Sequence, residues 1–159
     1  MTTPPFSPDQ LQISYCGIIS FQVQNDEDAP LRPADVEQYH FTVQSGLSVA
    51  QGDWLRVLLK VNCDAQPIDP EKRPLTGGIT TECFFQITGL DELLQGKANE
   101  PIPQGIAVTA VSIAYSTTRG LLASKASGTF LEGAVLPIVQ PAKLLAPDQP
   151  TLYSPRFSI

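Results

Sequence analysis

Four stretches of the chain alternate between apolar and polar residues, and this alternation constrains the fold more than any other feature. They span residues 11–24, 37–49, 54–63 and 79–89. Because successive side chains of a β-strand point to opposite faces, each stretch predicts a strand with one buried face. The intervening loops are rich in proline, glycine and charge and contain no helical segment, which is typical of an antiparallel meander. The apolar face of such a sheet must be covered by another element.

The C-terminal half of the chain predicts this cover. Pro101 and Pro103 precede a segment from Gln104 to about Ser127 in which small or apolar residues recur at helical spacing: Ile106, Ala110, Ile113, Ala114, Thr117 and Leu121. A short second helix is expected to begin at Ala142. We therefore predict one α+β domain over residues 1–159, a four-stranded antiparallel meander with one long and one short C-terminal helix packed on its apolar face. Residues 1–10 and 147–159 are expected to form a flexible arm and a C-terminal tail.

The balance of charge excludes several classes of partner. The 159 residues contain 10 Lys and Arg against 16 Asp and Glu, which gives a net charge of −6. Nucleic acid and anionic membranes both require clustered basic residues, so neither is an expected partner. No apolar run approaches the ~20 residues that cross a bilayer, and residues 1–6 lack the features of a secretory signal. We therefore expect a cytoplasmic protein.

Residues with catalytic or metal-binding chemistry are scarce. His40 is the single histidine, and the three cysteines, Cys16, Cys63 and Cys83, do not have the number or spacing of a zinc site or a disulfide framework. No Gly-x-Ser-x-Gly elbow occurs, and the glycine pair at 77–78 lacks the spacing of a phosphate loop and is expected to form a turn. We therefore expect no catalytic site, no metal and no cofactor. The alternative that stays open is a cysteine hydrolase in which one of the three thiols is paired with His40.

An ordered series of short motifs resembles the SecB export chaperones. In the N-terminal half these are Ile19-Ser20-Phe21, the third predicted strand at 54–65, and Phe84-Phe85-Gln86-Ile87-Thr88-Gly89-Leu90. In the C-terminal half they are Arg119-Gly120, Gly128-Thr129, Leu136-Pro137-Ile138-Val139 and Leu144-Leu145. The series covers about residues 11–146. The resemblance implies a sheet backed by a long and a short helix, a dimer of dimers, and a protein that holds non-native polypeptides for export.

Departures from the family pattern argue against the export role. The resemblance implies acidic residues on the exposed face of the first and fourth strands that help to dock the translocase ATPase, but the matching positions here are Ile18, Gln22 and Gly78. Docking to a translocase is therefore expected to be weak or absent, and any docking that occurs would point to other acids, such as those at 26–28. The alternative is a dedicated partner, either in a toxin–antitoxin system or as the ligand of a non-catalytic binding or scaffolding subunit.

Candidate polypeptide-binding residues are apolar side chains expected at the sheet edges and under the proline-rich crossover between the helices. They are Tyr39, Phe41, Leu75, Phe84, Phe85, Leu136 and Ile138. Strand alternation favours a core position for Phe41 and Phe85. Tyr39 is the strongest candidate, because it lies near a predicted strand end and carries a hydroxyl that prefers some water.

The polar face of the predicted sheet also carries apolar side chains, and clustered apolar groups on such a face mark a contact surface. The residues expected in an oligomer interface are Cys16, Ile18, Trp54 and Leu58. We expect a dimer or tetramer that uses this face and the long helix. The alternative is that these are scattered surface hydrophobic residues with no partner.

Overall fold

The computed structural model describes residues 6–24, 31–49, 51–94, 102–146 and 150–155. Within these residues the chain forms one antiparallel sheet with the strand order β1-β4-β3-β2-β5. The strands are β1 (Leu11–Val23), β2 (Val36–Val49), β3 (Trp54–Pro67), β4 (Leu75–Ile87) and β5 (Thr151–Pro155). The helices are α1 (Leu90–Leu93), α2 (Gln104–Lys125) and α3 (Pro141–Leu144), with single 3₁₀ turns at Pro8–Gln10 and Pro33–Asp35.

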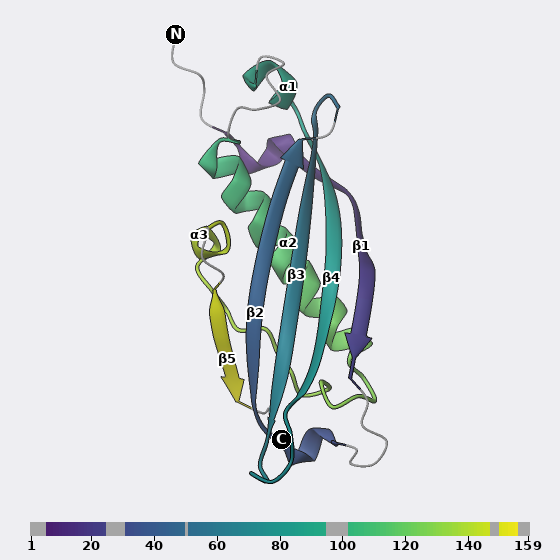
Figure 1. The fold of residues 1–159 in the computed structure, drawn as a ribbon. Coiled ribbons are helices and arrows are strands. Elements are labelled where there is room, and N and C mark those ends of the chain that lie inside the picture. The colour runs from purple at the N-terminus through teal and green to yellow at the C-terminus, as the bar shows by residue number, and fades with distance from the viewer. Residues whose placement is uncertain (1–5, 25–30, 50, 95–101, 147–149, 156–159) are drawn as a thin grey trace.

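The long helix α2 crosses one face of the sheet and leaves the other face open (Figure 1). We call the face that α2 covers the inner face and the opposite one the outer face. The α+β architecture predicted from the sequence is confirmed, with two differences. The sheet has five strands, because residues expected in the C-terminal tail form β5 beside β2. The expected four-stranded meander is wrong for β1, because this strand pairs with β4 and not with its neighbour in sequence, β2, so only β2, β3 and β4 form a meander.

The alternation of β3 shows why the sheet is buried on one side. Its inner-face residues are at most 1% exposed: Leu55, Val57, Leu59, Val61, Cys63 and Ala65. The residues between them, from Trp54 to Gln66, are half-buried or exposed. Continuous burial of apolar surface on the inner face is the main favourable term in the stability of such a domain.

Small residues allow α2 to lie close to the sheet. Its buried stripe comprises Ile106, Ala107, Ala110, Val111, Ala114, Tyr115, Thr118 and Leu122. The stripe ends on Thr118 and Leu122 rather than on the expected Thr117 and Leu121, because the four-residue steps continue from Ala114. The length and mean hydropathy of α2 (1.2) would also suit a membrane span, as is common for core helices that pack on a sheet in this way.

A buried pair of hydroxyls links this helix to the sheet. Thr118 Oγ1 donates to the carbonyl of Ala114 at 2.7 Å, and it lies 2.7 Å from Oγ1 of Thr81 on β4. Because the single proton of Thr118 is used within the helix, Thr81 is the donor across the interface. Both hydroxyls are therefore satisfied in an otherwise apolar core, which removes the desolvation cost of burying them.

The expected outward position of Cys16 and Ile18 is wrong, because β1 contains two β-bulges. The register with β4 shifts between Ile13 and Tyr15 and again between Ile18 and Ser20. A bulge places two residues opposite one, so side chains beyond it exchange faces. Cys16 is opposite the buried Cys83, and Ile18 is opposite the buried Thr81, so both pack against the inner-face core.

The glycine pair at 77–78 does not form the expected turn. Both glycines lie within β4, which begins at Leu75 and not at the predicted residue 79. A Cβ atom at Gly78 would lie 2.7 Å from the carbonyl oxygen of Val61, and one at Gly77 would lie 2.8 Å from Cδ1 of Leu131. The absence of side chains therefore allows β3 and the segment after α2 to approach β4 closely.

Candidate functional site

A crossover segment, Leu136–Gln140, connects the end of the α2 region to α3, and side chains of α2 hold it in place. Arg119 Nε donates to the carbonyl of Leu136 at 2.8 Å, and Arg119 Nη2 donates to the carbonyl of Pro137 at 3.3 Å. The hydroxyl of Tyr115 donates to the same Pro137 carbonyl at 2.5 Å. The guanidinium also lies 5.5 Å from the centre of the Tyr115 ring. A charged donor, a hydroxyl and a cation–π contact thus anchor the start of the crossover.

The protonation state of Tyr115 suits this role. Burial raises the pKa of its hydroxyl, although the neighbouring Arg119 acts in the opposite direction. The hydroxyl therefore remains a neutral donor to Pro137 across the physiological range.

Beyond the anchored segment, α3 and the start of α2 form an open groove beside β2 with a volume of about 420 Å³. Its lining is mainly apolar: Leu47, Ile102, Gln104, Ala107, Ala142, Leu145 and Ala146. The hydroxyl of Ser45 on β2 donates to the carbonyl of Leu144 and holds α3 against the strand. Gln104 is the single polar side chain among the described lining residues, and such a lining suits an extended apolar segment better than a polar small molecule.

Most of the predicted polypeptide-binding residues lie away from this groove and are not accessible. Those that are buried are Tyr39, Phe41, Leu75, Phe85 and Leu136. The expectation that the Tyr39 hydroxyl reaches water is wrong, because the side chain is fully buried and donates to the carbonyl of Phe130 at 2.7 Å. Ile138 is 91% exposed on the crossover, whereas Phe84 lies half-buried on the outer face. The structure therefore does not bring the seven residues into one site.

Sequence reasoning missed the residues that line the groove. The alternation within residues 37–49 places Leu47 on the buried face of a strand and gives no sign of a groove. Leu144-Leu145 is the one available signal, as part of the family-like series of motifs. The groove is assembled from β2, the start of α2 and the region of α3, and the sequence pattern of each element does not show that they meet.

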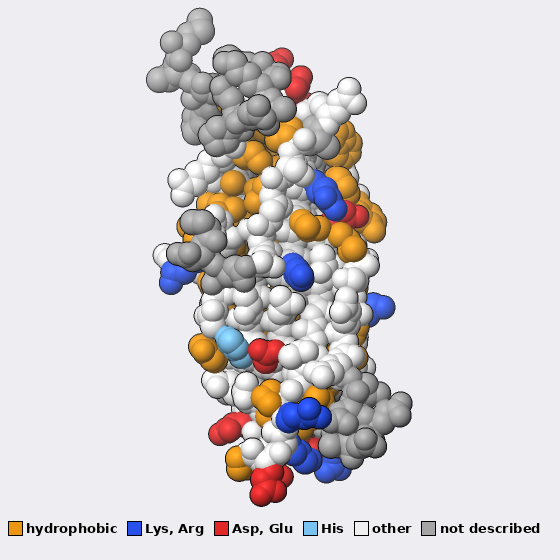
Figure 2. All heavy atoms as spheres, in the orientation of Figure 1, with side chains coloured by type: hydrophobic (Ala, Val, Ile, Leu, Met, Phe, Trp, Pro, Cys, Tyr) orange, Lys and Arg blue, Asp and Glu red, His pale blue; other side chains and the backbone are white. Residues whose placement is uncertain are grey.

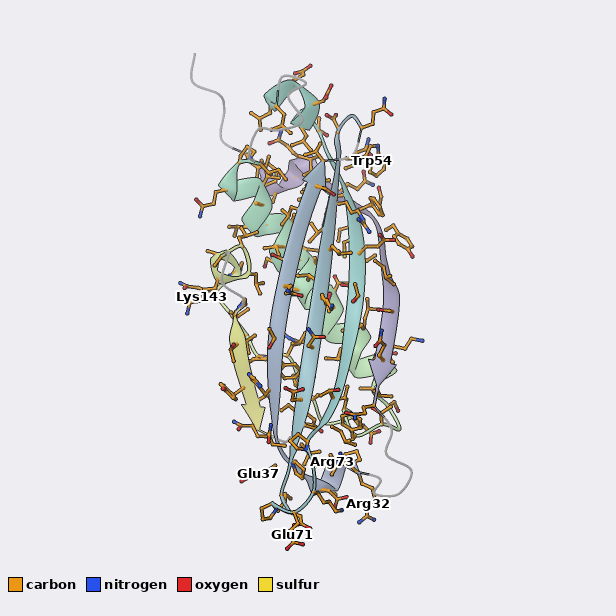
Figure 3. The ribbon with its side chains drawn as sticks, in the orientation of Figure 1. Arg32, Glu37, Trp54, Glu71, Arg73 and Lys143 are labelled. Carbon is orange, nitrogen blue, oxygen red and sulfur yellow. The ribbon has the colours of Figure 1, made fainter. Side chains whose placement is uncertain are left out.

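A second apolar cluster lies on the outer face, and it contains two of the four predicted interface residues. Its members are Tyr15, Trp54, Leu58 and Phe84, which surround an ion pair between Arg56 Nη2 and Glu82 Oε2 at 2.9 Å. Figure 2 shows hydrophobic side chains gathered towards the end of this face where Figure 3 places Trp54, while the centre of the face is polar. Cys16 and Ile18 are not part of this cluster, because they face inward.

Tyr15 enters the cluster because a glycine follows it by two residues. The Tyr15 and Phe84 ring centres are 6.4 Å apart. A Cβ atom at Gly17 would lie 2.1 Å from the Tyr15 hydroxyl, so the ring lies across the bare backbone of Gly17. The first bulge turns Tyr15 outward, and Gly17 leaves room for its ring.

Nearer the other end of the sheet, the geometry separates the histidine from two of the cysteines. His40 is on the outer face, 3.7 Å from Asp64 and stacked on Tyr153 of β5 with ring centres 4.9 Å apart. Cys63 and Cys83 are buried on the inner face, and burial raises the pKa of both thiols. The imidazole therefore cannot activate either thiol through the sheet. Among the described residues, no group of three His, Cys, Asp or Glu side chains is arranged to hold a metal ion.

No protein-family model matches the sequence, and no curated protein sequence matches it. A solved structure with a similar fold is the SecB-like chaperone Rv1957 of Mycobacterium tuberculosis, in complex with a ChAD peptide from the Rv1956 HigA1 antitoxin. The similarity has a TM-score of 0.61 and covers 82% of this chain and 91% of that chain, at 14% sequence identity. The chain therefore has the SecB-like fold that its ordered series of motifs predicted.

Proposed function

We propose that this protein is a non-catalytic, SecB-like chaperone that binds extended or non-native polypeptide in the groove beside β2. The observation that carries the proposal is the apolar lining of that groove, from Leu47 on the strand to Leu145 after α3, in a chain with the SecB-like fold. Apolar contact accepts many sequences, because it does not require a particular pattern of hydrogen-bonding side chains.

Among the residues that the structure describes, the groove lining contains no acid–base pair, which supports binding without chemistry. Gln104 is the one polar side chain among these lining residues, and an amide neither gives up nor takes a proton at neutral pH. His40 lies on the outer face of the sheet, whereas the groove borders the edge of β2.

We further propose that the client is a dedicated protein partner and that export is not the role of this protein. The structural neighbour is itself bound to a peptide from an antitoxin. In β3 and β4, the two outward carboxylates are Asp64, beside His40, and Glu82, paired with Arg56. The Arg56 guanidinium compensates the charge of Glu82, which leaves Asp64 as the one uncompensated carboxylate on these two strands that could attract a basic surface of a translocase. The acids at 26–28 lie outside the described residues.

We also propose a cytoplasmic homodimer or homotetramer that uses the outer-face cluster. The cluster places four large apolar side chains around one ion pair, which resembles the composition of an interface more than that of a solvated sheet. Sedimentation at micromolar concentration tests the assembly, and a strictly monomeric profile contradicts it.

The groove is tested with an unfolded client of defined composition. We expect reduced, carboxymethylated α-lactalbumin, labelled with a fluorophore, to bind the protein with a measurable Kd in an anisotropy titration. The double variant Leu47→Asn with Leu145→Asn should raise that Kd by about ten-fold or more, because it removes two apolar contacts of roughly 1 kcal/mol each. The matched control is Ile68→Asn, which removes an apolar side chain that is 56% exposed in the β3–β4 connection.

Three outcomes separate the possibilities. A raised Kd in the groove variant alone supports the proposed site. An unchanged Kd in a folded groove variant contradicts the site. If the unmodified protein does not bind any unfolded client but binds one defined partner at saturation, it is a scaffolding subunit and not a chaperone.

A further inference from the structure

The free edge of β2 is only partly covered by β5. β5 pairs antiparallel with β2 from Gln38 to Thr42, and the Val43 N–H donates to the carbonyl of Pro150 at 3.3 Å. β2 itself continues to Val49. Figure 1 shows β5 beside one part of β2 only, with α3 beside the part that β5 does not reach.

The uncovered part of the edge carries backbone groups that point towards a further strand. N–H and C=O groups alternate in direction along a strand, so the groups of Ser45, Leu47 and Val49 point to the same side as those of Val43. Among the residues that the structure describes, no backbone group pairs with these three on that side. Leu47 also lines the apolar groove. The unpaired strand edge and the groove are therefore one continuous surface.

The contacts of β5 show which side chains the covered part of this edge can bind. Leu152 is opposite Phe41 and packs against the core, while Tyr153 is opposite His40 and stacks on its ring on the outer face. Pro150 precedes the strand and Pro155 is its last residue, and proline cannot donate to a neighbouring strand. A short ladder of backbone bonds, the inward packing of Leu152 and the outward stacking of Tyr153 thus all contribute to holding β5 on the edge.

We infer that the edge of β2 is a strand-addition site for extended polypeptide and that residues 151–155 are its resident occupant, which a client replaces. The inference rests on the proposed function and adds a recognition mode to it. A client strand placed on β2 would pair with residues 38–42, continue along Ser45–Val49 and bring alternate side chains to the groove. It needs an apolar residue opposite Phe41 and N–H donors opposite Tyr39 and Phe41.

Competition has a measurable consequence. While β5 is docked, the part of the edge that it covers is closed to a client, and the apparent affinity falls in proportion to the fraction of molecules in which that part is open. Release of β5 should therefore tighten client binding. If β5 were only a structural strand, its release would instead weaken client binding.

A proline substitution releases β5 with a matched control on the same strand. Val43 donates to Pro150, and hydrogen-bonded pairs recur at every second residue of an antiparallel ladder. Phe41 and Leu152 are therefore also a hydrogen-bonded pair, so Leu152→Pro removes the N–H that donates to Phe41. Thr151 is the first residue of β5 and its N–H points away from β2, so Thr151→Pro is tolerated there. A protein lacking residues 151–159 is the second test variant.

Labelled, reduced and carboxymethylated α-lactalbumin is again the probe. We expect Leu152→Pro and the shortened protein to bind it with a Kd about five-fold or more below that of the unmodified protein, and Thr151→Pro to be unchanged. Hydrogen exchange at the Phe41 and Val43 amides should accelerate in Leu152→Pro and slow again when client binds.

Equal Kd values in all four proteins overturn this inference and leave the proposed function intact. Weaker binding in both released variants also overturns it, because β5 would then support the fold or the site. A lack of binding in all four proteins overturns the proposed function together with the inference.

Discussion

Arg119 Nε lies 2.8 Å from the carbonyl oxygen of Leu136, and this bond joins two family-like motifs that are 17 residues apart. Arg119-Gly120 lies within α2, and Leu136-Pro137 opens the crossover that leads to the groove. The two motifs are therefore the two sides of one contact, which holds the crossover against the helix.

Loss of the guanidinium should loosen the crossover. We expect Arg119→Gln to lower the free energy of unfolding by about 1–2 kcal/mol, because bonds from a charged donor to two half-buried carbonyls are lost. Urea unfolding measures the change, and limited proteolysis should show faster cleavage near residues 137–140. Arg119→Lys should recover only part of the stability, since an ammonium lacks the planar fork. The control is Lys125→Gln on the exposed end of α2, and equal stability of both variants contradicts the prediction.

Removal of the Tyr39 hydroxyl should affect stability and not client binding. In Tyr39→Phe the carbonyl of Phe130 loses a buried donor, which costs about 1–3 kcal/mol. Thermal or urea unfolding measures this loss, and Tyr153→Phe, whose side chain is 59% exposed, serves as the control. Weaker client binding at unchanged stability would contradict this prediction and support the sequence-based assignment of Tyr39 to the polypeptide-binding site.

Two substitutions on β1 test the bulges directly. Ile18→Glu should destabilise the protein by about 2 kcal/mol or more, because it places a carboxylate against the inner-face core. Gln22→Glu should change stability by less than about 0.5 kcal/mol, because Gln22 is exposed. An unbulged strand predicts that both glutamates are tolerated, so similar stabilities of the two variants would contradict the register.

The buried thiols should make the protein less stable in alkali. The pKa of Cys63 is raised by burial and, to a smaller extent, by Asp64, whereas an unperturbed thiol ionises near pH 9.0. Above pH 9 the unfolded chain therefore loses a proton that the folded protein retains, so the free energy of unfolding declines as pH rises. Urea unfolding between about pH 8 and 10.5 should show a shallower decline for Cys63→Ala than for the unmodified protein. Identical slopes would show that the thiol does not contribute.

Local pattern was sufficient for most of the sheet. In β2, β3 and β4 most residues at alternate positions are apolar, and the sheet buries most of that set, because the alternation of side chains is a property of each strand alone. The proline-preceded helix also begins at Gln104 as predicted, since its start depends on neighbouring residues. These elements and their order along the chain are what the sequence by itself determined, along with the resemblance that they carry, whereas the pairing of β1 with β4 was not.

The tertiary structure decided whatever depends on residues far apart in the chain. Two bulges in β1 turn Cys16 and Ile18 inward, and their positions come from the register with β4. Alternation turns Tyr39 inward, but its hydroxyl can be buried because a carbonyl 91 residues away accepts its hydrogen bond. Residues 151–155 carry no strong strand pattern and become β5 because the edge of β2 offers them hydrogen-bond partners. The groove exists only where β2, α2 and α3 meet, since no single segment buries enough apolar surface to form it.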